Sequence, residues 1–404
     1  MEQNALSEQH RIAAVEVIVV KGPRPEPPAG AHQSQVNALG GFYAEHRPTV
    51  TGGAPRPATG PAQSLYLRIA TDRGAEGLYG PIDREVTWAL LEQLAGFLIG
   101  QDALATSIVW DKLERLDRHA RHGHLKMAIS AVDNALWDLK GRVLGVPVWQ
   151  LLGGSSRPRI PAYASMLGTS LESDVIHEKA AEIAADGFAG QKWFLSDGPG
   201  GGPEGMKRSV RVAEDVREAV GPDQQIMFDV FQGWDLAYAR AWAQRVAPIQ
   251  PTWLEEPFPP NRYPAFAELH RSTGIPLSAG EHLYDRADVL PYLNDGTLAA
   301  VQSDPEWCGG VTELVRICAL AETFAVPVIP HGHGLHAALH VVASQSPATC
   351  PKIEYLVRSM PNRHHFEVSP PVPVGGTVAL PQRPGFGIEL DDAKIDERTL
   401  LSYS

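Results

Sequence analysis

The chain has 404 residues, of which 44% are apolar and 20% charged, and its formal net charge is −12. This length exceeds what one core ordinarily holds, so we expect two structural parts in a globular protein. The acidic balance argues against nucleic-acid binding, because phosphate contacts need clustered Lys and Arg. An acidic protein can still hold an acidic substrate when a metal ion supplies local positive charge.

The sequence contains no membrane signal. No run of about 18 uncharged apolar residues exists, so no membrane-spanning segment is expected, and Met1–His10 lacks the apolar core of a signal peptide. The cysteines, Cys308, Cys318 and Cys350, show no CxxC spacing. They argue against a disulfide scaffold or a zinc knuckle and favour a cytoplasmic protein.

The first quarter of the chain mixes strand and helix patterns. Ile12–Val20 and Ser64–Thr71 have the apolar character of strands. Between them, Gly22–Gly60 is rich in Pro, Gly and His and is too long for a structureless connector, so we expect a functional lid or flexible loop. Val86–Ile99 and Leu125–Leu144 are predicted helices, and a glycine and a proline follow the second one as stop signals.

From about Arg159 onward, short β-rich runs alternate with helical ones. Strands are predicted at Ile160–Ala164, Gly190–Phe194, Gln225–Asp229, Thr252–Glu255, Leu277–Gly280, Leu298–Gln302, Val326–Pro330 and Lys352–Leu356. Helices are predicted between them, at Glu172–Ala185, Met206–Val220, Leu236–Val246, Tyr263–Ser272 and Val311–Phe324. Such alternation indicates βαβ units and a parallel sheet, and eight strands favour a closed (β/α)8 barrel. The last forty or so residues return to turns and short strands and are expected to pack on the N-terminal part.

An acid or a histidine stands at the end of five of these strands. The residues are Asp229, Glu255, Glu281, Asp304 and His331, at intervals of 26, 26, 23 and 27 residues. In a barrel this spacing places all five at the C-terminal rim, where active sites form. Converging carboxylates repel one another, and a hard divalent cation with oxygen ligands removes that repulsion. Acids at these positions could singly be helix caps, but the regular set favours a magnesium site.

Longer motifs extend this pattern to a family resemblance. AISAVDNALWDLKGRVLGVPVWQLLGG, FDVFQGWD, WLEEPF and SAGEH resemble segments of the enolase superfamily, in its mandelate racemase branch. QSDPEWCGGVTELVRICALA, VIPHGHG and PVPVGGTVALPQRPGFGIEL resemble L-rhamnonate dehydratase and related acid-sugar dehydratases. The resemblance implies an α+β capping domain over the barrel. We expect residues 1–155 to form that cap, 156–365 the barrel, and 366–404 a segment packing on the cap.

The resemblance also implies roles for single residues. Asp229, Glu255 and Glu281 match the Mg2+ ligands, while Glu256 is left out because the first Glu of LEEP matches the ligand. His331 matches the base and Asp304 its partner, and a carboxylate on one ring nitrogen makes the other more basic. Lys192 matches a lysine near the substrate carboxylate. Glu354 matches an acid that hydrogen-bonds that carboxylate, although a buried structural glutamate is an open alternative.

The position of Phe194 narrows the predicted reaction. Racemases and lactonizing enzymes of the family have a second lysine there, and racemisation needs an acid and a base on opposite faces of the α-carbon. Dehydration of an acid sugar can proceed with one histidine. We therefore predict a Mg2+-dependent acid-sugar dehydratase acting on an aldonate or aldarate, with cycloisomerisation or epimerisation as the alternative.

The expected substrate contacts are less strongly marked. His32 and Arg56 in the N-terminal loop could reach distal hydroxyls or be solvated surface residues, His333 could line the pocket, and Trp193 adjoins Lys192. The cluster of His331, His333, His336 and His340 leaves a zinc hydrolase as a remote alternative, and a non-catalytic binding protein is another. The resemblance also implies a homo-oligomer.

Overall fold

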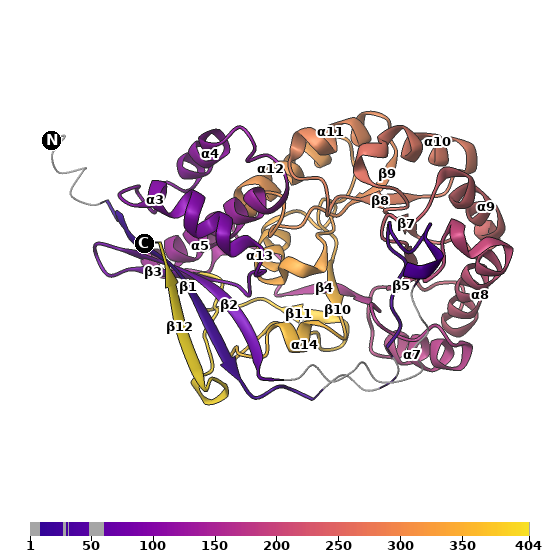
Figure 1. Ribbon diagram of the computed structural model, residues 1–404, viewed down its shortest axis with the longest axis horizontal. Helices are drawn as coiled ribbons and strands as arrows, with labels where there is room; N and C mark the ends of the chain where they lie inside the picture. The colour runs from indigo at the N-terminus through magenta and orange to yellow at the C-terminus, as the bar shows by residue number, and fades with distance from the viewer. Residues whose placement is uncertain (1–8, 27–29, 31, 48–59, 404) are drawn as a thin grey trace.

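The computed structural model describes residues 9–26, 30, 32–47 and 60–403 and divides into two joined parts. Figure 1 shows a cap of sheet and helices on one side and a ring of strands surrounded by helices on the other. Both ends of the described chain lie on the cap, because the last strand pairs with the first.

The cap is built on a four-stranded antiparallel sheet. Its strands are β1 (Ile12–Gly22), β2 (Ala62–Thr71), β3 (Glu76–Tyr79) and β12 (Glu397–Ser402), in the order β12-β1-β2-β3. Helical segments of the N-terminal part are η1 (Ala44–His46), α2 (Val86–Trp88), the π-helical η2 (Ala89–Leu94), α3 (Ala95–Leu98), α4 (Thr106–Leu116), α5 (Gly123–Leu144) and α6 (Val148–Leu151). The pairing of β12 with β1 confirms that the C-terminal end packs on the N-terminal part.

Helix α5 ends as its sequence predicted, with Gly145 in the left-handed conformation at φ 72°. The helix also fastens the cap to the barrel through buried polar side chains. Asn134 Nδ2 donates to the carbonyl of Pro305 at 3.0 Å, and Thr312 Oγ1 donates to Asp133 Oδ1 at 2.6 Å. Because both acceptor and donor groups are buried, these bonds fix how the cap sits beside the barrel loop that follows β9.

The second part is a parallel strand ring with helices outside it. Its strands are β4 (Arg159–Ser165), β5 (Gln191–Phe194), β6 (Ile226–Asp229), β7 (Trp253–Glu255), β8 (Leu277–Ala279), β9 (Leu298–Val301) and β10 (Ile353–Leu356). The longer helices are α7 (Ser173–Ala185), α8 (Gly202–Val220), α9 (Leu236–Val246), α10 (Tyr263–Thr273), α11 (Arg286–Asn294), α12 (Gly310–Thr323) and α13 (Leu335–Ser344). Short elements are η3 (Pro199–Gly201), η4 (Ala247–Ile249), η5 (Pro260–Arg262), η6 (Gly332–Gly334), α14 (Met360–Arg363), β11 (Thr377–Ala379) and η7 (Asp392–Lys394). Of the helices in the described ranges, none combines the length and the apolar character needed to cross a bilayer.

The predicted strand at Val326–Pro330 is wrong as an element, although its position in the ring is right. The segment makes one parallel bridge, between Val328 and Val301, and Ile329 N donates to the carbonyl of Val301 at 2.8 Å. Pro327 and Pro330 have no N–H to donate, so a regular ladder cannot form there. β10 pairs with β4 in parallel, which brings the two ends of the strand series together.

Strand alternation decides which side chains face the inside of the ring. A separate interior cluster contains Tyr163, Met227, Trp253, Ala300 and Ile329. Because side chains two residues apart share a face, Met227 precedes Asp229, Trp253 precedes Glu255 and Ile329 precedes His331 on the interior side. The apolar cluster therefore forms a floor beneath the functional groups at the strand ends.

The loop expected to cover the barrel reaches it in its described part. His32 forms a bridge with Thr169, Val36 N donates to the carbonyl of Leu195 at 2.9 Å, and Gly200 N donates to that of Gly41 at 2.7 Å. The segment 32–47 thus crosses the carboxyl ends of β4 and β5 (Figure 1).

Candidate active site

The centre of the site is a buried lysine surrounded by carboxylates. Lys192 on β5 directs Nζ to Glu354 Oε1 at 2.9 Å and to Asp229 Oδ2 at 3.4 Å, and it also pairs with Glu255. Asp229 and Glu255 lie opposite each other in the β6–β7 register, because each ends its strand. All four side chains are at most 5% exposed.

The charges in this group do not balance. Burial lowers the pKa of Lys192, but the charges of Glu255 and Glu354 outweigh burial and hold that pKa well above its usual value. Burial raises the pKa of Asp229 to about 6 and that of Glu255 well above its usual range, although Lys192 opposes both shifts. With Glu281 nearby, acids outnumber the one lysine. A hard divalent cation with oxygen ligands would compensate the excess charge, so these residues fit a magnesium ion.

His331 lies between two acids at the edge of this group. Its Nδ1 is 2.8 Å from Asp304 Oδ2, and its Nε2 is 2.9 Å from Glu281 Oε2. Burial lowers the pKa of His331, but Glu281 and the hydrogen bonds to both acids hold it well above the usual value. Burial raises the pKa of Glu281, but the charge of His331 and its hydrogen bond outweigh burial and lower that pKa to about 2. The pairing of His331 with Asp304 fixes the ring so that Nε2 faces the site.

Asp304 is itself held in place by the backbone. It is fully buried and accepts hydrogen bonds from Glu306 N at 2.7 Å and Gly334 N at 3.1 Å. Glu354 is similarly fixed, because Gly332 N donates to its Oε2 at 3.0 Å while Lys192 pairs with Oε1. Glu354 is thus a buried group with both oxygens engaged, at the inner edge of the same site.

A second histidine–acid pair was missed by the sequence reasoning. His282 Nδ1 is 2.7 Å from Glu256 Oε2 and 3.1 Å from Glu281 Oε1. Burial lowers the pKa of His282, but Glu256 outweighs it and raises that pKa to about 9. Within the described residues, ligand atoms of Glu256, Glu281 and His282 lie within 4.8 Å of one another. The signal was present in LEEP and GEH, where each predicted ligand has a polar neighbour.

Glu256 differs from Glu255 in its surroundings. Its backbone has φ 36°, and its Oε2 accepts a hydrogen bond from Gln232 Nε2 at 2.9 Å in addition to the contact with His282. Glu255 ends β7 on the interior face, above Trp253 and beside Lys192. We therefore keep Glu255 as the candidate ligand and regard Glu256 as the group that orients His282.

Three imidazoles surround the indole of Trp307. The ring centroids of His331, His333 and His282 are 5.0, 5.2 and 5.7 Å from that of Trp307. His333 uses both nitrogens, because Nδ1 is 2.7 Å from Glu306 Oε2 and Nε2 is 3.3 Å from Asp83 Oδ1. His333 therefore lies beside His331, and both of its ring nitrogens are engaged by acids of the protein.

The expectation that Trp193 binds substrate is corrected by the strand direction. Trp193 follows Lys192 on β5 and points to the opposite face, where it is fully buried. Its Nε1 donates to Gln191 Oε1 at 3.1 Å, and Gln191 donates in turn to the carbonyl of Ala180 on α7. Trp193 thus joins the strand to the outer helix layer.

Replacing Trp193 with phenylalanine tests this correction. The substitution removes one hydrogen bond and some packing volume, so we expect the free energy of unfolding to fall by about 1–3 kcal/mol. KM should not change, because the side chain does not face the site. Denaturant titration and steady-state kinetics measure the two quantities. A change in KM with unaltered stability would indicate that Trp193 contacts the substrate.

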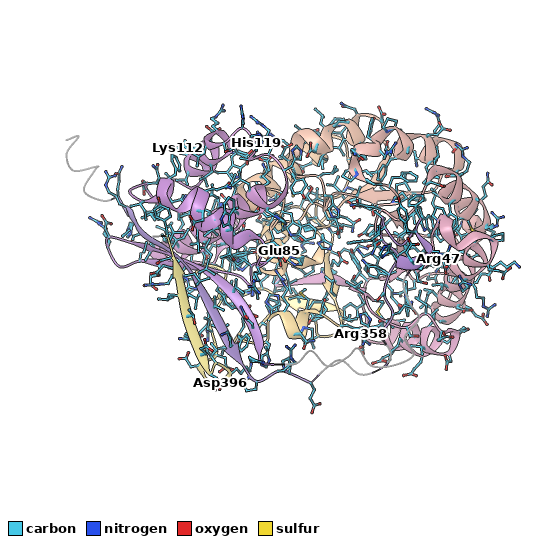
Figure 2. The ribbon with its side chains drawn as sticks, viewed as in Figure 1. Arg47, Glu85, Lys112, His119, Arg358 and Asp396 are labelled. Carbon is cyan, nitrogen blue, oxygen red and sulfur yellow. The ribbon has the colours of Figure 1, made fainter. Side chains whose placement is uncertain are left out.

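Two of the predicted substrate contacts, His32 and Arg56, belong to the N-terminal loop. His32 lies at the end of β4, where a Cβ added to Gly168 would meet the His32 ring at 3.2 Å and Arg358 Nε at 3.7 Å. Arg358 follows β10 and lies on that side of the barrel (Figure 2). Arg56 falls outside the described residues. His32 therefore lies at the barrel rim.

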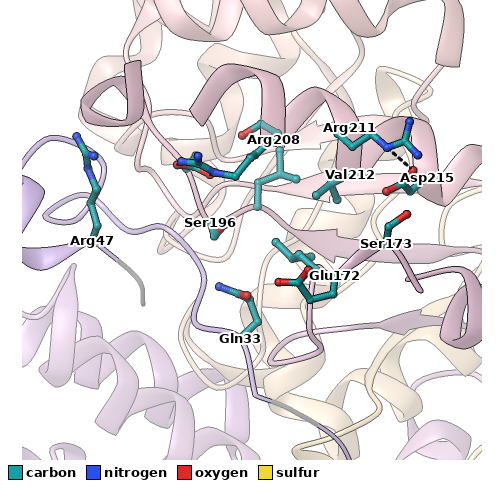
Figure 3. A pocket seen from close by; sticks show the side chains of 13 residues that line it. Gln33, Arg47, Glu172, Ser173, Ser196, Arg208, Arg211, Val212 and Asp215 are labelled. Carbon is teal, nitrogen blue, oxygen red and sulfur yellow. Dashed lines mark hydrogen bonds and ion pairs between the residues drawn. The ribbon is translucent and has the colours of Figure 1, made fainter. Parts of the chain in front are cut away.

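A separate cavity of about 490 Å3 lies between α7, α8 and the segment 33–47 (Figure 3). Four of its charged side chains form two ion pairs in the cavity wall. Arg208 contacts Asp197 at 2.6 Å and Arg211 contacts Asp215 at 2.7 Å. This cavity does not include the group around Lys192, so the chemistry described above does not depend on it.

The other histidines of the cluster contact residues outside the group around Lys192 and His331. His340 is fully buried on α13, and its Nδ1 accepts a hydrogen bond from Trp149 N at 3.0 Å. His336 Nε2 and His364 Nδ1 approach Glu367 at 2.8 and 2.7 Å, while their other ring nitrogens have no partner among the described residues. Ligand atoms of His336, His364 and Glu367 lie within 4.8 Å of one another, and each histidine approaches the Glu367 carboxylate through one ring nitrogen.

A cap built from both chain ends joins a parallel strand ring with helices outside it, and this is the architecture of an enolase-type fold. Residues 57–153 match the family described as "Mandelate racemase / muconate lactonizing enzyme, N-terminal domain", and residues 175–394 match "Enolase C-terminal domain-like". The chain belongs to the mandelate racemase/muconate lactonizing enzyme family of the enolase superfamily.

Individual relatives carry several activities. The L-rhamnonate dehydratase of Saccharopolyspora erythraea is 34% identical over 81% of this chain and 83% of its own length. The Mg-complexed rhamnonate dehydratase structure from Gibberella zeae matches with TM-score 0.81 and 26% identity, covering 97% of this chain and 96% of that one. The 3,6-anhydro-D-galactonate cycloisomerase of Zobellia galactanivorans matches with TM-score 0.75 and 26% identity, covering 96% and 100%.

Proposed function

We propose that the protein is a Mg2+-dependent dehydratase of acid sugars, acting on an aldonate or aldarate of the L-rhamnonate type. The observation that supports this most is His331, held by Asp304 at 2.8 Å beside a buried group of carboxylates and Lys192. The dehydratases among the relatives add support. As the sequence suggested, we expect a cytoplasmic homo-oligomer whose partner is its small-molecule substrate.

Asp229, Glu255 and Glu281 would hold the magnesium ion. When bound, Mg2+ would neutralise the substrate carboxylate and stabilise the charge that develops when the α-proton leaves. Lys192 would place a second positive charge beside that carboxylate, and Glu354 would hold Lys192 in position through the 2.9 Å contact. These groups are preorganised, because all of them are buried and paired before substrate binds.

His331 would move the proton. Its Nε2 would take the C2 proton of the substrate, and the resulting imidazolium would return a proton to the C3 hydroxyl as it leaves as water. Asp304 would hold Nδ1–H and stabilise the imidazolium during the step. The enol product would then tautomerise to a 2-keto-3-deoxy acid.

Phe194 supports dehydration over racemisation. It occupies the strand position where a second lysine would act from the opposite face of the α-carbon, and it is 7% exposed. Lys192 Nζ lies 5.3 Å from the centroid of its ring, so this position contributes an apolar wall beside the lysine. Among the residues predicted from the sequence, His331 is then the acid–base group.

Incubating the protein with Mg2+ and a panel of aldonates and aldarates tests the proposal. We expect at least one member to yield a 2-keto acid and to lose the mass of one water. A product that keeps the substrate mass would instead indicate cycloisomerisation or epimerisation. This is the second candidate reaction, because a cycloisomerase is among the structures that the chain resembles. The absence of turnover for every member of the panel would count against the dehydratase.

A further inference from the structure

A closed ring of alternating charges joins the cap to the barrel mouth. His333 Nε2 is 3.3 Å from Asp83 Oδ1 and His333 Nδ1 is 2.7 Å from Glu306 Oε2. Arg363 approaches the same two acids, with Nη2 2.7 Å from Glu306 Oε2 and Nη1 3.4 Å from Asp83 Oδ1. Each cation therefore bridges both acids, and each acid bridges both cations. We call these four residues the charge ring.

The charge ring connects segments that are far apart in the sequence. Asp83 lies in the cap between β3 and α2, Glu306 follows β9, His333 follows the 326–330 segment, and Arg363 ends α14. Their side chains are 26%, 11%, 21% and 16% exposed, respectively. The four charges form a network that is largely shielded from solvent. Such a network can stabilise the contact between cap and barrel, whereas an isolated ion pair on the surface adds little.

Further contacts fix the ring to the cap. Arg363 Nη2 donates to the carbonyl of Pro81 at 2.7 Å, and Tyr79 Oη donates to Glu306 Oε1 at 3.2 Å. The turn from Tyr79 to Asp83 is thus bound to barrel residues at both of its ends. Removing one member of the ring would leave the others buried with unbalanced charge.

The barrel members of the ring are adjacent to the proton-transfer pair. Glu306 is two residues after Asp304, and its backbone N–H donates to Asp304 Oδ1 at 2.7 Å. His333 is two residues after His331, and the two imidazoles stack with centroids 6.3 Å apart and planes 11° apart. A shift of the ring would therefore be transmitted to both members of the pair.

We propose that the charge ring is a latch that holds the cap against the barrel and positions the His331–Asp304 pair. On this proposal, which rests on the proposed function for its kinetic consequences, His333 is a positioning residue and does not bind substrate. Its two nitrogens serve the cap and the barrel at once. The latch differs from the α5 contacts because it lies at the reacting histidine.

The charge on His333 gives the latch a pH dependence. The groups that face its ring are Asp83, Glu306, Arg363 and the imidazole of His331. Burial and Arg363 lower the pKa of His333, but Glu306 and Asp83 outweigh them and raise it to about 9. A raised pKa means that the stabilisation is complete below about pH 6.5 and is lost as the pH rises through about 9.

Single and double substitutions test the latch. We expect His333→Asn and Asp83→Asn each to lower kcat/KM by about 10- to 100-fold, because small misplacements of reacting groups are costly. The double variant should lose little more than either single one, because each breaks the same contact. Amide protection of residues 82–86 in hydrogen exchange should fall by about tenfold or more in all three variants. The reason is that loss of one member of a buried ion pair leaves the charge of the other member without a partner.

A cation that does not titrate near pH 9 tests the charge itself. His333→Lys should restore protection of residues 82–86 at pH 7 and keep it at pH 9.5, where wild-type protection, corrected for intrinsic exchange, declines. His124→Asn is the matched control, because His124 is exposed and outside the ring. It should alter neither quantity.

The outcomes separate the latch from the proposed function. Exchange needs no substrate, so a protein that dehydrates no sugar would fail the proposed function while the latch is still tested. Additive losses in the double variant, or unchanged protection of residues 82–86, would overturn the latch. A lower Tm with unchanged kcat/KM and unchanged protection would also overturn it, because it would assign the ring a role in stability alone.

Discussion

Replacing His331 with asparagine is expected to lower kcat for dehydration by about 10,000-fold, the upper end of what one acid–base group contributes, because one ring serves as base and acid. Asparagine is a suitable replacement because its amide N–H can still donate to Asp304, which His331 Nδ1 contacts at 2.8 Å. Only the basic Nε2 is lost. Steady-state kinetics on the sugar identified from the panel measure the effect.

The loss in the His331→Asn variant must be separable from a loss of metal or fold. Calorimetric titration with Mg2+ and thermal unfolding should give values close to those of the wild type. His124→Asn, an exposed histidine of the cap, is the matched substitution and should keep full activity. If His331→Asn retained activity within tenfold of the wild type, another group would have to be the base, and His282 would be the first to examine.

Glu255→Gln is expected to weaken Mg2+ binding by at least about 100-fold, because substitutions of residues that only support metal ligands already cost about 10- to 100-fold. Glutamine keeps the shape of the side chain and removes the charge that faces Lys192. Calorimetric titration with Mg2+ measures the affinity directly. Activity should fall with metal occupancy and recover in part at high Mg2+ concentration.

The neighbouring acid gives a matched comparison for this ligand. Glu256→Gln differs by one position and removes the partner of His282, so we expect it to weaken Mg2+ binding by less than about tenfold while lowering the pKa of His282. The reverse order, with Glu256→Gln more damaging than Glu255→Gln, would move the metal to the group formed by Glu256, Glu281 and His282, whose ligand atoms lie within 4.8 Å.

Much of the fold was predictable because strong patterns coincide with local signals. Leu236–Val246 was predicted residue for residue, and the side chain of Asp235 caps it by accepting from Tyr238 N. The strands that end at Asp229 and Glu255 are short apolar runs that stop at a charge. The prediction of a strand at 326–330 was wrong, because an apolar run indicates a strand even where its backbone cannot donate hydrogen bonds. Two prolines in this segment prevent a regular ladder. α11 was not predicted, and Pro291 inside it is a signal against helix.

The site was predictable in its parts and not in its contacts. The repeat spacing predicted that Asp229, Glu255 and Glu281 lie at one rim, because the parallel strands of a barrel end at the same rim. Spacing could not show that Lys192 contacts Glu354, since that distance depends on how the ring closes. The sequence interpretation placed Trp193 at the site because it adjoins Lys192. Neighbouring residues on a strand point to opposite faces, so Trp193 faces away from the site. The charge ring was invisible for a related reason, as Asp83 and Arg363 meet only when the cap is in place.

The central claim is that this site removes a proton next to a carboxylate and expels the neighbouring hydroxyl, with Mg2+ required. Its most direct test is the reaction of the identified acid sugar in D2O, followed by proton NMR with and without Mg2+. We predict loss of the C2 proton signal, a 2-keto-3-deoxy product that carries deuterium at C3, and no reaction after the metal is removed. Exchange of the C2 proton in substrate that keeps its hydroxyl, or dehydration that continues without a divalent metal, would contradict it.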